Sequence, residues 1–449
     1  MSRFVQADRS QPFLLPPDLR EWLPADDLAH FILEAVERVP LDHFQVNERN
    51  SGSEQYHPQM MLALLIYCYA NGIFSSRRIE RASYRDIGVR YITANCQPDH
   101  DTICKFRREN LSAISESFLQ VLLLARELKL LQVGTVSVDG TKIDANASKH
   151  RGVRYDRARQ LREQLQTEID ELLGQAETAD AEDRPDPQQL PRELKRREVL
   201  KAQLDEACER LQAQAKARAQ AERAEYERKV AAREQRQGRR KGKRIQPPKD
   251  VPEDSEQSNL TDPDSRLMRQ NKRSEYRQGY NAQAVVDADG SQLVLGARVS
   301  QCASDRNELV ATIAAIPGEL ASPERVLADN GYACGDEVAE LEARAIEVLV
   351  ATGKEGRQRP HDLRPPPVGP LPREPQARWL QEMKQKLEEP ENRALYRLRQ
   401  QTVEPVFGIV KEVLGFRRFL LRGVEKVSLE WQLVTLAYNC KRLHRLTLA

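Results

Sequence analysis

The chain has 449 residues, which is enough for two or three domains. Its residues are 40% hydrophobic and 31% charged, and this composition indicates that part of the chain does not form a core. A formal net charge of +2 restricts any nucleic-acid contact to local basic patches, and seven scattered cysteines without CxxC spacing favour a reduced, cytoplasmic protein over a disulfide scaffold. The first residues lack the apolar core of a signal peptide, and no apolar run approaches the ~20 residues that span a bilayer, so we expect no membrane association.

Residues 1–125 are predicted to form an all-α N-terminal domain. The apolar segment 58–69 indicates a buried helix that ends at an Asn-Gly pair. Shorter, arginine-rich helices are predicted over 77–82 and 103–108. Short helices with a glycine-containing turn and a basic face favour a helix-turn-helix that contacts DNA. A helical packing domain with solvated arginines is the alternative.

A strand is predicted over residues 134–140, after which the sheet pattern stops. Apolar residues recur at helical spacing over 155–177 and at heptad-like spacing over 192–236, with a polar breaker between them. This pattern predicts an antiparallel, coiled-coil-like helical hairpin inserted into an α/β domain. The expected domains are therefore 1–125, then an α/β domain made of 126–149 and 261–449, interrupted by an insertion over 150–260.

The second helix of the insertion leads into a basic stretch, residues 236–249, with seven basic residues and no acidic one. Dense basic charge beside glycine and proline favours contact with DNA phosphates, and a solvated tail is the alternative. The residues that we expect to contact DNA here are Arg239, Arg240, Lys241, Lys243 and Arg244.

The sheet pattern resumes with a hairpin over residues 279–299. Asp305 is expected to cap a helix that runs to Ile316. The next elements alternate as strand, helix and strand, which predicts a βαβ unit. The expected bounds of the remaining elements are strand 325–329, helix 335–345, strand 347–351, an Arg- and Pro-rich loop over 356–375, a helix near 377–389, a helix carrying Glu404, and a last helix over 428–446 with one apolar stripe.

Three acidic residues stand in different settings along this order. Asp139 and Asp329 each end an apolar strand, and Glu404 lies in a helical pattern. Carboxylates brought together from two neighbouring strands and a crossing helix bind hard divalent cations, and paired Mg²⁺ ions drive in-line displacement at phosphorus. The alternative carboxylates are Asp144, Asp262, Asp264 and Asp305. Of these, Asp144 is expected to lie beyond the end of the strand and to have at most a supporting role.

Three motifs occur in order at residues 138–143, 328–332 and 396–411. They resemble the three boxes of DDE transposases from bacterial insertion sequences, and the order of elements is similar to the ribonuclease-H-like mixed sheet. The third box resembles the tyrosine-arginine-glutamate-lysine motif of one branch, with Tyr396, Arg399, Glu404 and Lys411 at the matching positions. Arg399 lies one residue further from Glu404 than that pattern has it, which leaves Arg397 or Gln400 as alternatives. Further stretches that fit the family, from about residue 10 to 445, are 56–58, 72–77, 98–103, 261–266 and 279–283.

The resemblance implies a DNA transposase that cleaves the ends of its own element and joins them to target DNA. It implies two Mg²⁺ ions, with Mn²⁺ as an alternative, held by Asp139, Asp329 and Glu404. The implied partners are double-stranded DNA, both terminal repeats and target, and a second copy of the chain on paired ends, at the nucleoid. Lys142 and Lys149 are expected to contact the DNA backbone, together with Tyr396, Arg399 and Lys411.

Two other classes of function remain open from the sequence. One is a transposase-derived DNA-binding protein that has lost catalysis, which the intact acidic residues disfavour. The other is an interaction protein organised by the helical hairpin. The catalytic interpretation predicts that strands 134–139 and 325–329 are neighbours in one sheet. It also predicts that the three carboxylates lie roughly 4–8 Å apart.

Overall fold

The computed structural model describes residues 18–46, 55–181, 190–236, 246–270, 273–353 and 377–448. The chain divides into two compact units, which are described separately. The core unit consists of Met1–Thr141, Asn281–Leu421 and Glu425–Ala449. The insertion unit consists of Lys142–Tyr280 and Arg422–Val424. No helix in the described ranges combines the length and the apolar character needed to cross a membrane.

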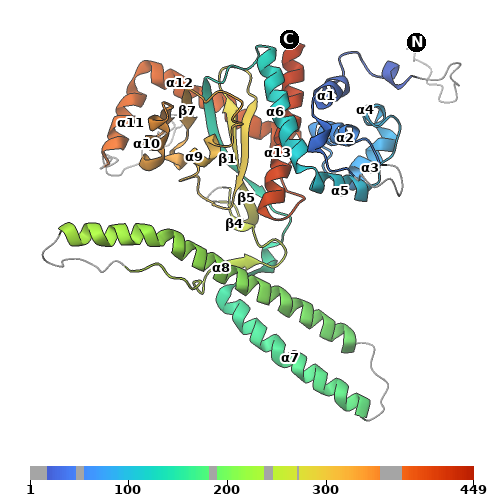
Figure 1. Ribbon diagram of the computed structural model, residues 1–449, viewed down its shortest axis with the longest axis vertical. Coiled ribbons are helices and arrows are strands. Elements are labelled where there is room, and N and C mark those ends of the chain that lie inside the picture. Colours follow the sequence, from blue (N-terminus) through green and yellow to red (C-terminus); the bar gives the residue numbers. More distant parts are fainter. Residues whose placement is uncertain are drawn as a thin grey trace, which may run out of the picture. The chain divides into compact units, whose positions relative to one another are not determined.

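The core unit begins with a group of helices (Figure 1). Their bounds are η1 (Leu19–Trp22), α1 (Leu28–Glu37), η2 (Leu41–His43), α2 (Pro58–Ala70), α3 (Ser76–Arg85), α4 (Ile87–Ile92), α5 (His100–Glu109) and α6 (Leu111–Glu127). Aspartates begin four of them: Asp18, Asp27, Asp86 and Asp99 accept hydrogen bonds from first-turn amides of η1, α1, α4 and α5. The predicted buried helix is confirmed as α2, which begins with proline at its first turn.

A six-stranded mixed sheet follows, with β4, β5, β1, β7 and β8 side by side and β6 paired to β5. Its strands are β1 (Thr135–Asp144), β4 (Arg266–Met268), β5 (Arg277–Asp287), β6 (Val294–Ser300), β7 (Arg325–Ala328) and β8 (Glu347–Val350). β1, β7 and β8 run parallel, whereas β4 and β6 pair antiparallel with β5. The predicted neighbours β1 and β7 and the predicted βαβ unit are therefore confirmed, within a ribonuclease-H-like mixed α/β fold.

One strand boundary differs from the expectation. β1 continues to Asp144, so Asp139 lies inside the strand and the placement of Asp144 beyond its end was wrong. β1 pairs with β7 only over residues 135–138, and an apolar run marks this paired segment but not the polar continuation of the strand. The three-residue strand β4 was not predicted, because it is too short to show an alternating pattern.

Helices cover both sides of the sheet in the core unit (Figure 1). α13 (Val424–Thr447) lies on one side, where Trp431 Nε1 donates to the Gln283 carbonyl over 2.9 Å and Asn439 exchanges hydrogen bonds with Val294. The other helices are α9 (Leu309–Ile313), η4 (Asn330–Tyr332), α10 (Gly335–Ala343), α11 (Arg378–Glu388), α12 (Pro390–Gly408) and the π-helix η5 (Ile409–Val413). The last helix, α13, buries more of its surface than the predicted apolar stripe. It also contacts the N-terminal helices, where Lys441 Nζ donates a hydrogen bond to the Ala70 carbonyl.

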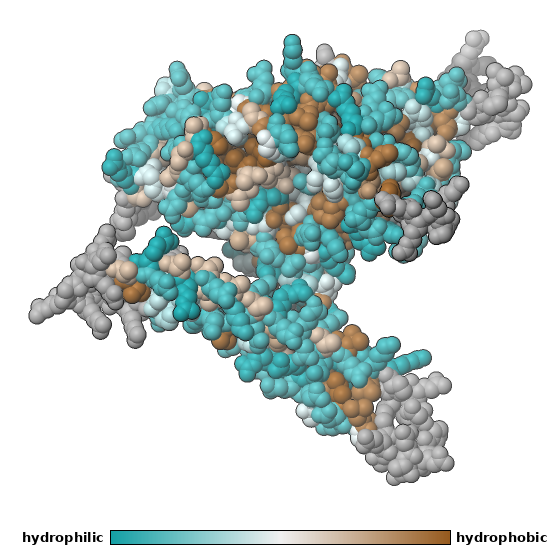
Figure 2. Space-filling model, in the orientation of Figure 1, coloured by the Kyte–Doolittle hydropathy of each residue, from teal (hydrophilic) through white to brown (hydrophobic). Residues whose placement is uncertain are grey.

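The insertion unit contains the predicted helical hairpin, α7 (Tyr155–Ala181) and α8 (Leu190–Arg236). Leu165, Leu204 and Leu211 meet in a small core of its own, and the visible surface of the helices is mainly hydrophilic (Figure 2). The hairpin adds nothing to the main sheet. Instead the short strands β2 (Gly152–Arg154) and β3 (Gln257–Asn259), which were not predicted, pair with each other at its base, after η3 (Lys149–Arg151).

Candidate active site

The register of β1 and β7 brings two aspartates to one edge of the sheet. Val138 pairs with Ala328 in parallel strands, so Asp139 and Asp329 each follow the last paired residue. Asp329 then caps η4, its Oδ1 accepting from the Gly331 amide over 2.7 Å. The ends of parallel strands are where α/β sheets place ligand sites.

Helix α12 carries the third carboxylate, Glu404, and also the arginine that links Glu404 to Asp139. The two terminal nitrogens of the Arg399 guanidinium lie 3.4 Å from Asp139 Oδ2 and 3.2 Å from Glu404 Oε1. Because one planar guanidinium contacts both, these two oxygens lie within about 10 Å of each other. Arg397 and Gln400 are exposed, whereas the Arg399 side chain is only 13% exposed. Of the three alternatives, the structure brings Arg399 to the carboxylates.

The surroundings of Asp139 disfavour its ionised form. Burial raises the pKa of Asp139 to about 7, and the neighbouring carboxylates of Asp329 and Asp305 act in the same direction. Arg399 and the Gly140 amide oppose this rise. A site of this kind favours a cation, because a second positive charge would let Asp139 ionise fully.

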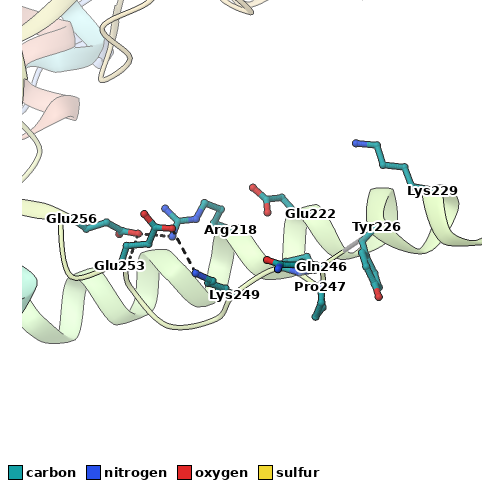
Figure 3. Close-up of a pocket in the computed structure, with 10 residues that line it drawn as sticks. Arg218, Glu222, Tyr226, Lys229, Gln246, Pro247, Lys249, Glu253 and Glu256 are labelled. Carbon is teal, nitrogen blue, oxygen red and sulfur yellow. Dashed lines mark hydrogen bonds and ion pairs between the residues drawn. The ribbon is translucent and has the colours of Figure 1, made fainter. Parts of the chain in front are cut away.

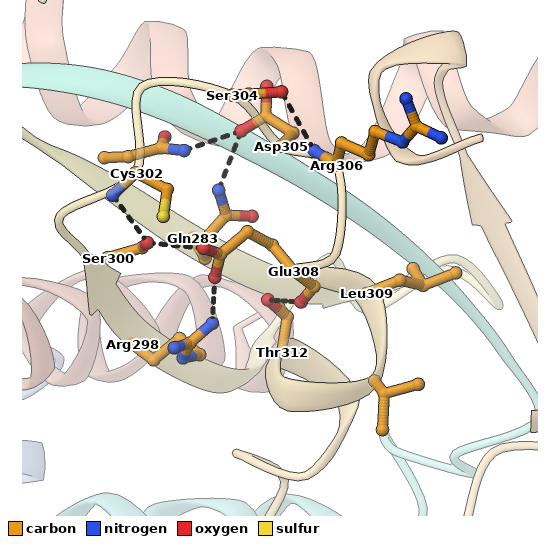
Figure 4. A network of polar contacts seen from close by, with 12 residues as sticks. Gln283, Arg298, Ser300, Cys302, Ser304, Asp305, Arg306, Glu308, Leu309 and Thr312 are labelled. Carbon is orange, nitrogen blue, oxygen red and sulfur yellow. Dashed lines mark hydrogen bonds and ion pairs between the residues drawn. The ribbon is translucent and has the colours of Figure 1, made fainter. Parts of the chain in front are cut away.

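Asp305 belongs to a network of polar side chains beside the two aspartates (Figure 4). Its Oδ1 accepts from Asn281 Nδ2 over 2.7 Å and from Gln283 Nε2 over 2.9 Å, and Gln283 in turn accepts from the Tyr332 hydroxyl. A Cβ at Gly140 would lie 2.6 Å from Asp305 Oδ1, so any other residue after Asp139 would displace the side chains of this network. The network thereby fixes the backbone that follows both aspartates.

The predicted capping role of Asp305 was wrong. α9 begins at Leu309 with Glu308 at the cap position, and Glu308 accepts from Ser300 Oγ over 2.6 Å (Figure 4). The sequence analysis missed Asn281 and Gln283 as supporting residues. Their signal was present, because they are polar residues two apart, and therefore on one face, of a strand that is buried along almost its whole length.

The other predicted DNA-contacting residues are spread over both units. Tyr396 is half-buried on α12 and interacts electrostatically with Arg399. Lys411 lies seven residues after Glu404, but it falls in the π-helix η5, so this spacing does not correspond to two α-helical turns. In the insertion unit, Lys142 lies on β1 and Lys149 is paired with Glu275 over 3.2 Å. Arg239, Arg240, Lys241, Lys243 and Arg244 lie outside the described residues, as does the predicted loop 356–375.

The insertion unit has a groove of about 810 Å³ between α8 and residues 246–256, which include the end of the basic stretch (Figure 3). Its charges are mixed and partly paired: Arg218 lies 2.7 Å from Glu256 and Lys249 lies 3.9 Å from Glu253. None of the three predicted carboxylates lines it. This groove therefore shows neither the acidic cluster of a metal site nor the uniform basic lining of a phosphate channel.

The donors at the sheet edge fit a hard divalent cation in kind, since all are carboxylates. In the ranges that the structure describes, no group of three or more His, Cys, Asp or Glu side chains is arranged to hold a metal ion. At Asp139 and Glu404 the guanidinium of Arg399 contacts both carboxylates.

Comparison with known proteins gives two family matches. The model described as "Transposase DDE domain" matches residues 250–440, and the model described as "Transposase domain (DUF772)" matches residues 17–109. The comparisons with curated proteins and with solved structures gave no match. The two transposase domains flank the inserted hairpin and include Asp329, Glu404 and the N-terminal helices. Taken with the mixed sheet that carries Asp139 beside Asp329, they establish that this chain belongs to the DDE transposases of insertion sequences.

Proposed function

We propose that the chain is a catalytically active transposase that cleaves the ends of its insertion sequence and joins them to target DNA. The observation that carries this proposal is the convergence of Asp139 and Glu404 on one guanidinium, with Asp329 at the neighbouring strand end. These carboxylates come from parts of the chain that are far apart in sequence. Their gathering at a strand edge supports a reaction site more than a surface charge pair.

Asp139, Asp329 and Glu404 are the residues that would hold two Mg²⁺ or Mn²⁺ ions. When bound, such ions supply an activated water or 3′-hydroxyl and stabilise the leaving 3′-oxygen. The chain's own contribution is to fix the carboxylates. The Asn281, Gln283 and Asp305 network supports the backbone after both aspartates, so the ligands are oriented before DNA arrives.

Tyr396 and Lys411 are proposed to hold the DNA strand beside the cut, as the tyrosine-arginine-glutamate-lysine motif implies. The basic stretch over 236–249 would add contacts to the phosphates of double-stranded DNA. We further propose that two copies assemble on paired terminal repeats and act on DNA in the cytoplasm. These assignments rest on the family and on the residue types.

The test is cleavage and joining of the element's own terminal repeats in Mg²⁺ by three variants, Asp139→Ala, Asp329→Ala and Glu404→Ala. Each is expected to abolish both reactions and to retain DNA binding, measured by mobility shift. Asp144→Ala is the matched control, because Asp144 lies on the same strand and is paired with Arg277. Near-normal cleavage by any of the three variants would remove that residue from the site.

A further inference from the structure

The contacts of Arg399 are poorly suited to a purely stabilising role. Its distances of 3.4 Å and 3.2 Å to Asp139 and Glu404 exceed the ~2.7–2.9 Å of good charge-assisted hydrogen bonds. In the part of the chain that the structure describes, its Nε is buried and has no hydrogen-bond partner. A buried donor without a partner is energetically unfavourable. The arginine is held there by charge rather than by close geometry.

The position of the guanidinium coincides with the position that divalent cations would need. It contacts Asp139 Oδ2 and Glu404 Oε1, and the carboxylate of Asp329 adds to the negative potential around it. A metal ion that bound between the same two oxygens would have to displace it. Both cations compete for the same negative charge, so their occupancies are mutually exclusive.

On the basis of the proposed function, we propose that Arg399 is an internal counter-ion that occupies the carboxylate site in the DNA-free protein. Divalent ions displace its guanidinium, and a DNA phosphate accepts it, because the planar fork of arginine matches phosphate as well as carboxylate. Metal binding is therefore weak without DNA and stronger with it. By thermodynamic linkage, metal ions strengthen the contact with DNA by the same factor.

The experiment measures Mn²⁺ binding to the full-length, metal-free protein by electron paramagnetic resonance of the free ion, with no cleavage step. Without DNA, Arg399→Gln is expected to bind Mn²⁺ about tenfold more tightly than the wild type, within the usual range of coupling between sites. A short DNA duplex of arbitrary sequence should strengthen Mn²⁺ binding to the wild type but not to Arg399→Gln. Arg399→Lys, which keeps the charge but loses the fork, should lie between them.

Arg397→Gln is the matched control, because Arg397 is exposed on the same helix. It should bind Mn²⁺ as the wild type does. If Arg399→Gln and Arg399→Lys both melt like the wild type and bind Mn²⁺ no more tightly, Arg399 is not a counter-ion for this site. Asp139→Asn separates this result from failure of the proposed function: unchanged Mn²⁺ binding by that variant would show that the carboxylate site itself is wrongly assigned.

Discussion

At the scale of single residues, Asp139 has the most unusual environment in the candidate site. Its pKa is raised to about 7 by burial and by Asp329 and Asp305, against the opposing charge of Arg399. In an unfolded chain the same group titrates near 3.9. Between these two values the folded state keeps a proton that the unfolded state has lost. The folded state is therefore destabilised as the pH rises through this window, in the absence of metal.

We expect the thermal midpoint of the metal-free wild type to fall between about pH 4 and pH 7, and Asp139→Asn to remove much of that fall. The asparagine mimics the protonated acid, so the variant should be more stable than the wild type at about pH 7 and similar to it at about pH 4. Differential scanning calorimetry in the presence of a chelator measures this. Parallel pH profiles for the two proteins would show that Asp139 titrates normally.

The positions of the three acidic residues were predictable, because each stands at a recognisable point of a strand or helix pattern. The guanidinium between them was not, since it depends on how α12 meets the sheet. The same holds for Asp305: its spacing suggested a helix cap, and only the tertiary structure brings Asn281 and Gln283 to its carboxylate. Contacts between residues far apart in sequence leave no local signal.

At the scale of elements, a buried polar group joins the N-terminal helices to the last helix. Arg107 of α5 donates to the Tyr69 hydroxyl of α2 over 2.8 Å, and Tyr69 donates to Glu430 of α13 over 3.3 Å. Glu430 also accepts from the amides of Leu420 and Leu421. All three side chains are almost fully buried, so removing one charge leaves another without compensation.

Glu430→Ala is expected to lower the free energy of unfolding by about 3–5 kcal/mol, because it leaves Arg107 buried and unpaired. Urea denaturation followed by circular dichroism measures the change. Glu425→Ala, an exposed position on the same helix, should have little effect. The double variant Arg107→Met with Glu430→Leu should lose less than Glu430→Ala alone. A larger loss in the double variant would contradict the view that an isolated charge is the main penalty.

Long elements were predicted well from periodicity, and short or irregular ones were not. α2, α7, α8 and the βαβ unit repeat their pattern often enough to be recognised. β2, β3 and β4 each have three residues, and the π-helix η5, which begins directly after Gly408, interrupts α-helical spacing. The loss of α-helical phase at η5 is why the position of Lys411 could not be deduced by counting turns.

At the scale of the whole molecule, the order of strands requires distant segments to meet. β1 and β5 are neighbours in the sheet although residues 145–276 separate them in the chain. The sequence predicted this interruption, since the alternating pattern stops and later resumes. It did not predict how the two ends of the insertion are joined.

The β2–β3 ribbon has a consequence for the order in which this chain folds. Pairing of Gly152 with Asn259 at the base of the hairpin shortens the open loop between β1 and β5 roughly fivefold. The entropic cost of closing that loop then falls by about 1.4 kcal/mol. The hairpin has a core of its own, so it can form first and act as a kinetic template for the sheet. Val153→Asp should then slow protection of the β1 and β5 amides in pulsed hydrogen exchange. Equal rates in the two proteins would mean that the sheet nucleates independently of the ribbon.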